Sequence, residues 1–158
     1  MKQIMALFML GLLVMSAPLT AAKSLSELDS TWLPQYNAAK DEYVKAQDFY
    51  KENRQNWISA RNTIRDYDER GGDAFRTDYL TAKEAAQDWL VSALDVMDTQ
   101  LNTVQVWGNN QIKNDVDRAQ LNDEIDEQRT DIADLRADLV AIDPASNEAK
   151  DQLIANAK

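Results

Sequence analysis

The chain of 158 residues contains neither cysteine nor histidine. Without cysteine no disulfide can hold the fold together, so packing of a hydrophobic core must stabilise it. Cys and His are also the usual ligands of zinc, haem, copper and iron–sulfur clusters. Ser-His-Asp and Cys-His catalysis needs them as well. We therefore expect no catalytic residues, no cofactor, no metal site and no enzymatic activity.

Glycine and proline are scarce, with four Gly and three Pro in the whole chain. Phosphate-binding loops, nucleophile elbows and dinucleotide fingerprints all need glycine at fixed positions, and none of these motifs occurs. No segment shows the alternation and β-branched enrichment that is typical of strands. The composition and patterning therefore predict an all-α protein.

The N-terminal segment has the order of a secretory signal peptide. Lys2 is followed by an apolar stretch from Ile4 to Met15 and by the small residues Thr20-Ala21-Ala22. This order predicts a signal peptide at 1–22, cleaved before Lys23, and hence a secreted or periplasmic protein. The alternative is an uncleaved anchor, although the stretch is shorter than the roughly 20 residues that span a bilayer. No second apolar run of that length follows, so no stable membrane insertion is expected after cleavage.

The predicted mature chain is strongly acidic. Of the charged residues, only Lys2 lies in the signal segment, so residues 23–158 carry 16 basic and 27 acidic residues, a net charge of −11. Such a chain is repelled by nucleic acids and by anionic lipid headgroups. We expect no nucleic-acid partner, whereas a basic partner or solubility at high ionic strength is compatible with this charge.

Large side chains recur every seven residues in the first part of the mature chain. The repeat consists of Tyr36, Tyr43, Tyr50, Trp57 and Ile64. The d positions of the same heptad hold Ala39, Ala46, Asn53, Ala60 and Tyr67. A strict seven-residue repeat is typical of a helix that packs lengthwise against another helix. Buried Asn fixes the register of coiled coils, and the same role is predicted for Asn53.

Three groups of turn residues divide the mature chain into helices. Gly71-Gly72 before Asp73 predicts a helix end and a new N-cap. Trp107-Gly108-Asn109 predicts a C-cap, and Asp143-Pro144 predicts a stop. The expected elements are a polar lead-in at 23–33, helices at about 34–68, 73–107 and 110–142, and a short C-terminal helix at 144–157.

The predicted fold is an elongated antiparallel three-helix bundle with coiled-coil-like packing and a short C-terminal helix. Loops of a few residues make successive helices antiparallel neighbours. The second helix has a wide apolar stripe, which indicates contact with two neighbours. In the third helix the apolar pattern shifts from Ile112, Val116 and Ala119 to a stripe that starts at Leu121. We interpret this shift as a phase change within one helix.

The rings of Tyr36, Tyr43, Tyr50 and Trp57 form the candidate partner or ligand surface. The plain interpretation is a core seam, in which rings at the a positions alternate with alanine at d. The alternatives are a surface shared with a second chain and a site for a small apolar ligand. The ligand site would require a cavity lined by Trp57, Trp89, Tyr50 or Met97.

Two acidic segments were considered as sites. Residues 115–138 hold nine carboxylates and three Arg, which predicts a solvated outer face, with docking of a basic partner or adaptation to high salt as alternatives. The loop from Asp66 to Thr77 has Asp and Gly at some positions of a calcium-binding loop. However, Arg70 and Thr77 occupy positions where that loop requires oxygen ligands. We predict no calcium site there.

Taken together, the sequence favours an exported, non-enzymatic helical-bundle protein that acts through protein–protein contacts, as a structural or adaptor component of the cell envelope. A protein partner or self-association is expected. The alternative hypothesis is an extracytoplasmic ligand-binding or sensor-type helical module.

Overall fold

The computed structural model describes residues 32–67 and 72–157, and these residues are helical over most of their length. The helices are α2 (Trp32–Arg65), α3 (Asp73–Gln111), α4 (Asp115–Ala141) and α5 (Ala149–Asn156). No strand occurs within the described ranges, and the predicted all-α helical bundle is confirmed. The predicted signal peptide and most of the lead-in lie outside these residues, while Trp32 and Leu33 already belong to α2.

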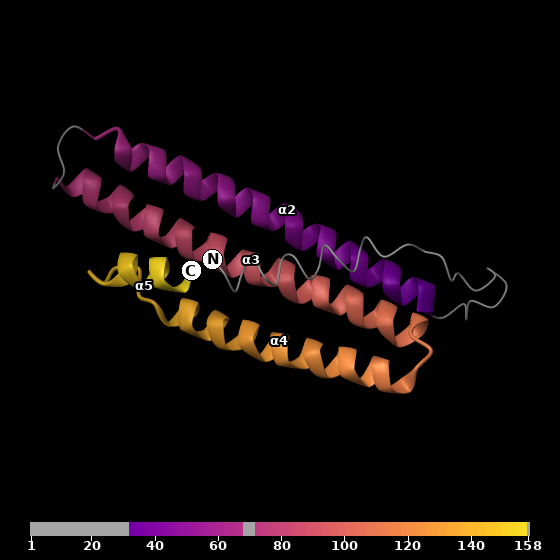
Figure 1. Cartoon of the computed structure of the whole chain (residues 1–158). Helices are drawn as coiled ribbons and strands as arrows, with labels where there is room; N and C mark the ends of the chain where they lie inside the picture. The colour runs from indigo at the N-terminus through magenta and orange to yellow at the C-terminus, as the bar shows by residue number, and fades with distance from the viewer. Residues whose placement is uncertain (1–31, 68–71, 158) are drawn as a thin grey trace.

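The long helix α3 lies between α2 and α4 (Figure 1). Both outer helices pack along α3, but no Cα atom of α2 comes within 8 Å of one in α4. The connections at 66–72 and 112–114 are short, so each helix runs antiparallel to the one before it (Figure 1). The bundle is therefore an open layer in which α3 has two long neighbours and each outer helix has one.

The α2–α3 seam is built on the small residues of the heptad. Ala39 is 4% exposed and Asn53 is 8% exposed, whereas the rings at the a positions are only half-buried. Alanine at d lets the two backbones approach, and the rings then cover the side of the seam. The Asn53 Nδ2 group donates to the Asp88 carbonyl oxygen at 3.4 Å, which connects this buried amide to α3.

The main apolar core lies where α3, α4 and α5 meet. Leu94 and Met97 of α3 pack with Ile132 and Leu139 of α4. Its remaining buried members are Ile142, Ala149 and Leu153. Complete burial of one Leu or Ile side chain contributes about 1.5–3 kcal/mol. The short helix α5 contributes two side chains to this core, Ala149 and Leu153, on the side of the layer away from α2.

The first helix ends earlier than predicted, at Arg65 instead of residue 68. Tyr67 lies beyond the helix, and its hydroxyl group donates to Asp78 Oδ2 at 2.6 Å. Its ring also meets the ring of Phe75 edge-on at 5.5 Å. The hydrogen bond to Asp78, followed by burial and the charge of Asp78, raises the pKa of Tyr67. Tyr67 therefore fastens the end of α2 to the start of α3 without being a d residue of a continuous helix.

The sequence predicted that the second helix ends at Gly108. In the structure α3 continues to Gln111. Gly108 is buried, and a Cβ atom at this position would lie 2.3 Å from Leu121 Cδ2. Only glycine leaves room for this close approach of α4 to α3. The predicted C-cap at Gly108 is therefore wrong, because packing between helices requires this glycine and no left-handed cap does.

The third helix starts at Asp115 and not near residue 110. Asn114 is its N-cap, and the Asn114 side chain accepts a hydrogen bond from the Val116 backbone N–H at 2.9 Å. Ile112 lies in the connection, and Val116 is 73% exposed. The apparent phase change is therefore a helix boundary, because the residues before Leu121 do not belong to the same buried stripe.

The last helix also begins later than predicted, at Ala149 instead of residue 144. Asp143 instead closes a turn: its side chain accepts from the Ala145 N–H at 2.9 Å, and its carbonyl accepts from the Ser146 N–H at 2.9 Å. An Asp before proline is suited to such a turn. The residues between α4 and α5 thus form a connection in which Asp143 satisfies two backbone donors.

We predict that Gly108→Val lowers the free energy of unfolding by about 1–3 kcal/mol, because the added atoms meet Leu121. Urea unfolding followed by circular dichroism measures this loss. The double variant Gly108→Val/Leu121→Ala should lose less than the sum of the two single variants. Strictly additive losses would show that the two residues do not share this space.

Candidate interaction surfaces

The four candidate rings all lie on the α3 side of α2, and all are half-buried. Trp57 stacks on Trp89 of α3, with ring centroids 4.6 Å apart, and the Tyr50 ring lies 6.3 Å from the Trp89 ring. Tyr36 packs beside Trp32 of its own helix at 5.8 Å. Tyr50 and Trp57 are thus brought together around Trp89, whereas Tyr36 belongs to a separate pair.

The four residues that the ligand-site alternative names are not gathered in one place. Met97 is 6% exposed and belongs to the core between α3, α4 and α5. Trp57 and Trp89 are stacked on each other. A cavity of about 210 Å³ lies between α2 and α3, and five of its six lining residues are polar or charged. It is lined by Asn53, Asn56, Thr81, Glu84, Ala85 and Asp88.

Trp89 contains a buried polar atom that sequence reasoning did not single out. Its indole Nε1 has no hydrogen-bond partner among the residues that the structure describes. Indole N–H groups usually find a partner when they are buried. On the other side of the stack, the Arg61 guanidinium lies 5.1 Å from the Trp57 ring centroid, within the range of a cation–π contact.

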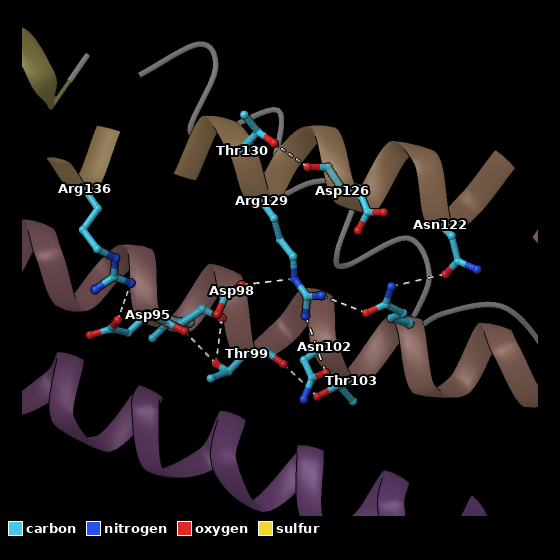
Figure 2. Close-up of polar contacts among 12 residues, drawn as sticks. Asp95, Asp98, Thr99, Asn102, Thr103, Asn122, Asp126, Arg129, Thr130 and Arg136 are labelled. Atoms are coloured by element: carbon cyan, nitrogen blue, oxygen red, sulfur yellow. Dashed lines mark hydrogen bonds and ion pairs between the residues drawn. The ribbon is translucent and has the colours of Figure 1, made fainter. Parts of the chain in front are cut away.

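A ladder of polar side chains joins α3 to α4 (Figure 2). Arg129 of α4 donates to Asp98 Oδ1 at 3.2 Å and to Gln105 Oε1 at 2.8 Å, and its third nitrogen lies 3.5 Å from Asn102 Oδ1. About two helical turns further along α4, Arg136 forms an ion pair with Asp95. Figure 2 shows both arginines pointing from α4 toward α3. The ladder fixes the antiparallel alignment of these helices.

The sequence contained a signal for this ladder that we did not use. Asn122, Arg129 and Arg136 recur every seven residues, and all three bond to α3. The prediction of the buried stripe used only the periodic apolar residues, and the periodic polar residues were assigned to a solvated face. Sequence alone does not say which residues of two stripes with equal periods face the neighbouring helix.

The ladder leaves carboxylates as the charged groups on the outer side of α4. Its three arginines are half-buried and turned to other parts of the chain: Arg129 and Arg136 bond to α3, and Arg118 bonds to the Ile112 carbonyl and to Asp115. All nine acidic residues of α4 are exposed. They are Asp115, Asp117, Asp123, Glu124, Asp126, Glu127, Asp131, Asp134 and Asp138.

The described residues contain neither a metal site nor a helix that could span a membrane. No group of three or more acidic side chains in these ranges is placed to hold a metal ion. The calcium-loop comparison depends on positions 68–71, which lie outside the described residues. No helix of the described chain is long and apolar enough to cross a membrane.

Comparisons with known proteins add no relative: no family model, no curated protein and no solved structure matches this chain. The arguments about function consequently depend on the surfaces of the molecule itself.

We predict that Arg129→Met lowers the free energy of unfolding by about 1–2 kcal/mol, because Asp98, Asn102 and Gln105 lose their shared donor. Urea denaturation is the measurement, since urea does not screen charge. The matched control is Arg54→Met, an exposed arginine of α2, whose effect should stay within about 0.5 kcal/mol. Equal losses for the two variants would contradict a structural role for the ladder.

Proposed function

We propose that this chain is an exported, non-enzymatic helical-bundle protein that acts through protein–protein contacts, as a structural or adaptor component of the cell envelope. The observation that carries the proposal is the open layer, in which α2 and α4 each have one long neighbour and a free side. Helices that pack on one side only, with a periodic pattern on the other, are suited to contact with another protein.

The charge of the free sides supports binding rather than chemistry. General acid–base catalysis needs a carboxyl group held in a site that alters its proton affinity, whereas the acids of α4 lie on an exposed helix surface. A surface of one sign attracts a partner of opposite charge and repels most others. A basic protein surface is therefore the kind of partner that α4 fits.

Export is the part of the proposal that depends on the N-terminal sequence. The test is the mass of the protein recovered from outside the cytoplasm of cells that produce the full chain. The expected product starts at Lys23 and contains 136 residues. A protein that keeps residues 1–22 and stays in the cytoplasm would overturn the export proposal.

Protein contact is tested by site-specific photo-crosslinking in intact cells. A photoreactive side chain at Glu127, exposed on α4, should give a defined crosslinked protein in the envelope fraction, because the acidic side is the proposed contact. The matched control is Asp151, an exposed acid of α5. If neither Glu127 nor Lys51 of α2 yields a crosslinked protein at normal expression, the proposed function fails.

A ligand-binding or sensor module is the second candidate, and the cavity between α2 and α3, which is lined mostly by polar residues, favours it. Occupancy of the 210 Å³ cavity should alter the emission of the Trp57–Trp89 stack, which lies against the same α2–α3 seam. Tryptophan fluorescence across a panel of small polar ligands measures the change. An invariant spectrum across the panel would rule out this candidate.

A further inference from the structure

The free side of α4 carries an acidic stripe with a seven-residue period. Asp117, Glu124, Asp131 and Asp138 follow one another at intervals of seven, and all four are exposed. The arginines of α4 are turned away from this stripe, as described above. The net charge of α4, with nine acids and three arginines, is −6.

One exposed flank of α2, beside its seam with α3, carries a basic stripe with the same period. Lys40, Arg54 and Arg61 fall at multiples of seven, with Gln47 at the remaining position, and the three cations are exposed. Lys51 and Arg65 lie beside them, so five of the six cations of α2 fall within an arc of about 80° at 100° per residue. The four acids of α2 lie outside that arc, and the net charge of this helix is +2.

The two stripes match in length. Lys40 to Arg61 and Asp117 to Asp138 each cover three heptads, about 32 Å of helix at 1.5 Å per residue. Leu33, one heptad before Lys40, is 45% exposed. Val44, one helical turn after Lys40, is 43% exposed. Charged heptad positions that flank apolar ones set partner choice and orientation between helices.

We propose that the occupant of these surfaces is a second copy of the chain, with the basic stripe of α2 in one copy against the acidic stripe of α4 in the next. This inference rests on the proposed function, because it names the partner of the same surfaces. Within one chain α3 separates α2 from α4, so the complementary stripes meet only between copies. The contact joins two different surfaces, and such contacts produce rings or open chains of subunits.

Charge-reversal variants of the full mature chain test the contact by sedimentation velocity over a range of concentrations. Asp131→Lys/Asp138→Lys and Lys40→Glu/Arg54→Glu should each weaken self-association about tenfold. The control Glu148→Lys/Asp151→Lys changes two exposed acids at the start of α5. It has the same net charge as the α4 variant, and should associate at least as well as wild type, because general repulsion between acidic copies is reduced.

Mixing the two stripe variants provides the decisive measurement. One variant keeps the native basic stripe of α2 and the other keeps the native acidic stripe of α4, so the mixture should regain wild-type association. Circular dichroism confirms that each variant is folded. A wild-type chain that remains monomeric at all concentrations overturns the inference, as does an equal effect of the α4 variant and the α5 control. If Glu127 then still crosslinks to a different protein in cells, the proposed function stands and only the identity of the partner is wrong.

Discussion

The contact of α3 with helices on two opposite sides is the constraint on which the rest of the structure depends. Without disulfides, the fold is held by packing, and α3 takes part in both long interfaces. Small residues make this possible: Ala39 lies deep in the α2 seam, and Gly108 admits Leu121 from α4. A bulky residue at either position would hold a neighbouring helix away from α3.

The two interfaces of α3 differ in chemistry, and this difference determines the outer surface. On the α2 side, aromatic rings and alanines form the seam, and the cations of α2 remain outside it. On the α4 side, an apolar core is accompanied by a polar ladder that uses Arg129 and Arg136. Since arginine stays charged at any ordinary pH, these residues neutralise Asp98 and Asp95 internally. Among the described residues, Asp115 is the one acid of α4 that pairs with an arginine of its own helix, Arg118, and the other eight have no such ion pair.

Several elements were predictable because local sequence determines them. The period of Tyr36, Tyr43, Tyr50 and Trp57 identified a helix that packs lengthwise, and Gly71-Gly72 identified the break after it. The prediction was wrong at Gly108, which local rules assign to a cap and the tertiary packing assigns to a close approach. It was also wrong at the start of α4, because an N-cap at Asn114 and a phase change produce the same interruption of the apolar pattern.

The candidate surface was predicted only in part, for a similar reason. The four rings were correctly placed on one helix, but only the structure shows that Tyr50 and Trp57 meet around Trp89 of α3, whereas Tyr36 pairs with Trp32 of its own helix. The roles of the arginines in α4 were missed entirely, since a charged residue in a regular stripe reads as solvated until its neighbour is known.

The sequence by itself determined the helical class, the approximate lengths of the helices, the antiparallel order and the exclusion of histidine and cysteine chemistry. These properties follow from periodicity, turn residues and composition, which act over a few neighbouring residues. Only the tertiary structure decided that the three long helices form an open layer and that the arginines of α4 face inward. Both outcomes depend on the direction from which one helix approaches another, and a seven-residue repeat fixes the period of a face without fixing which neighbour it meets.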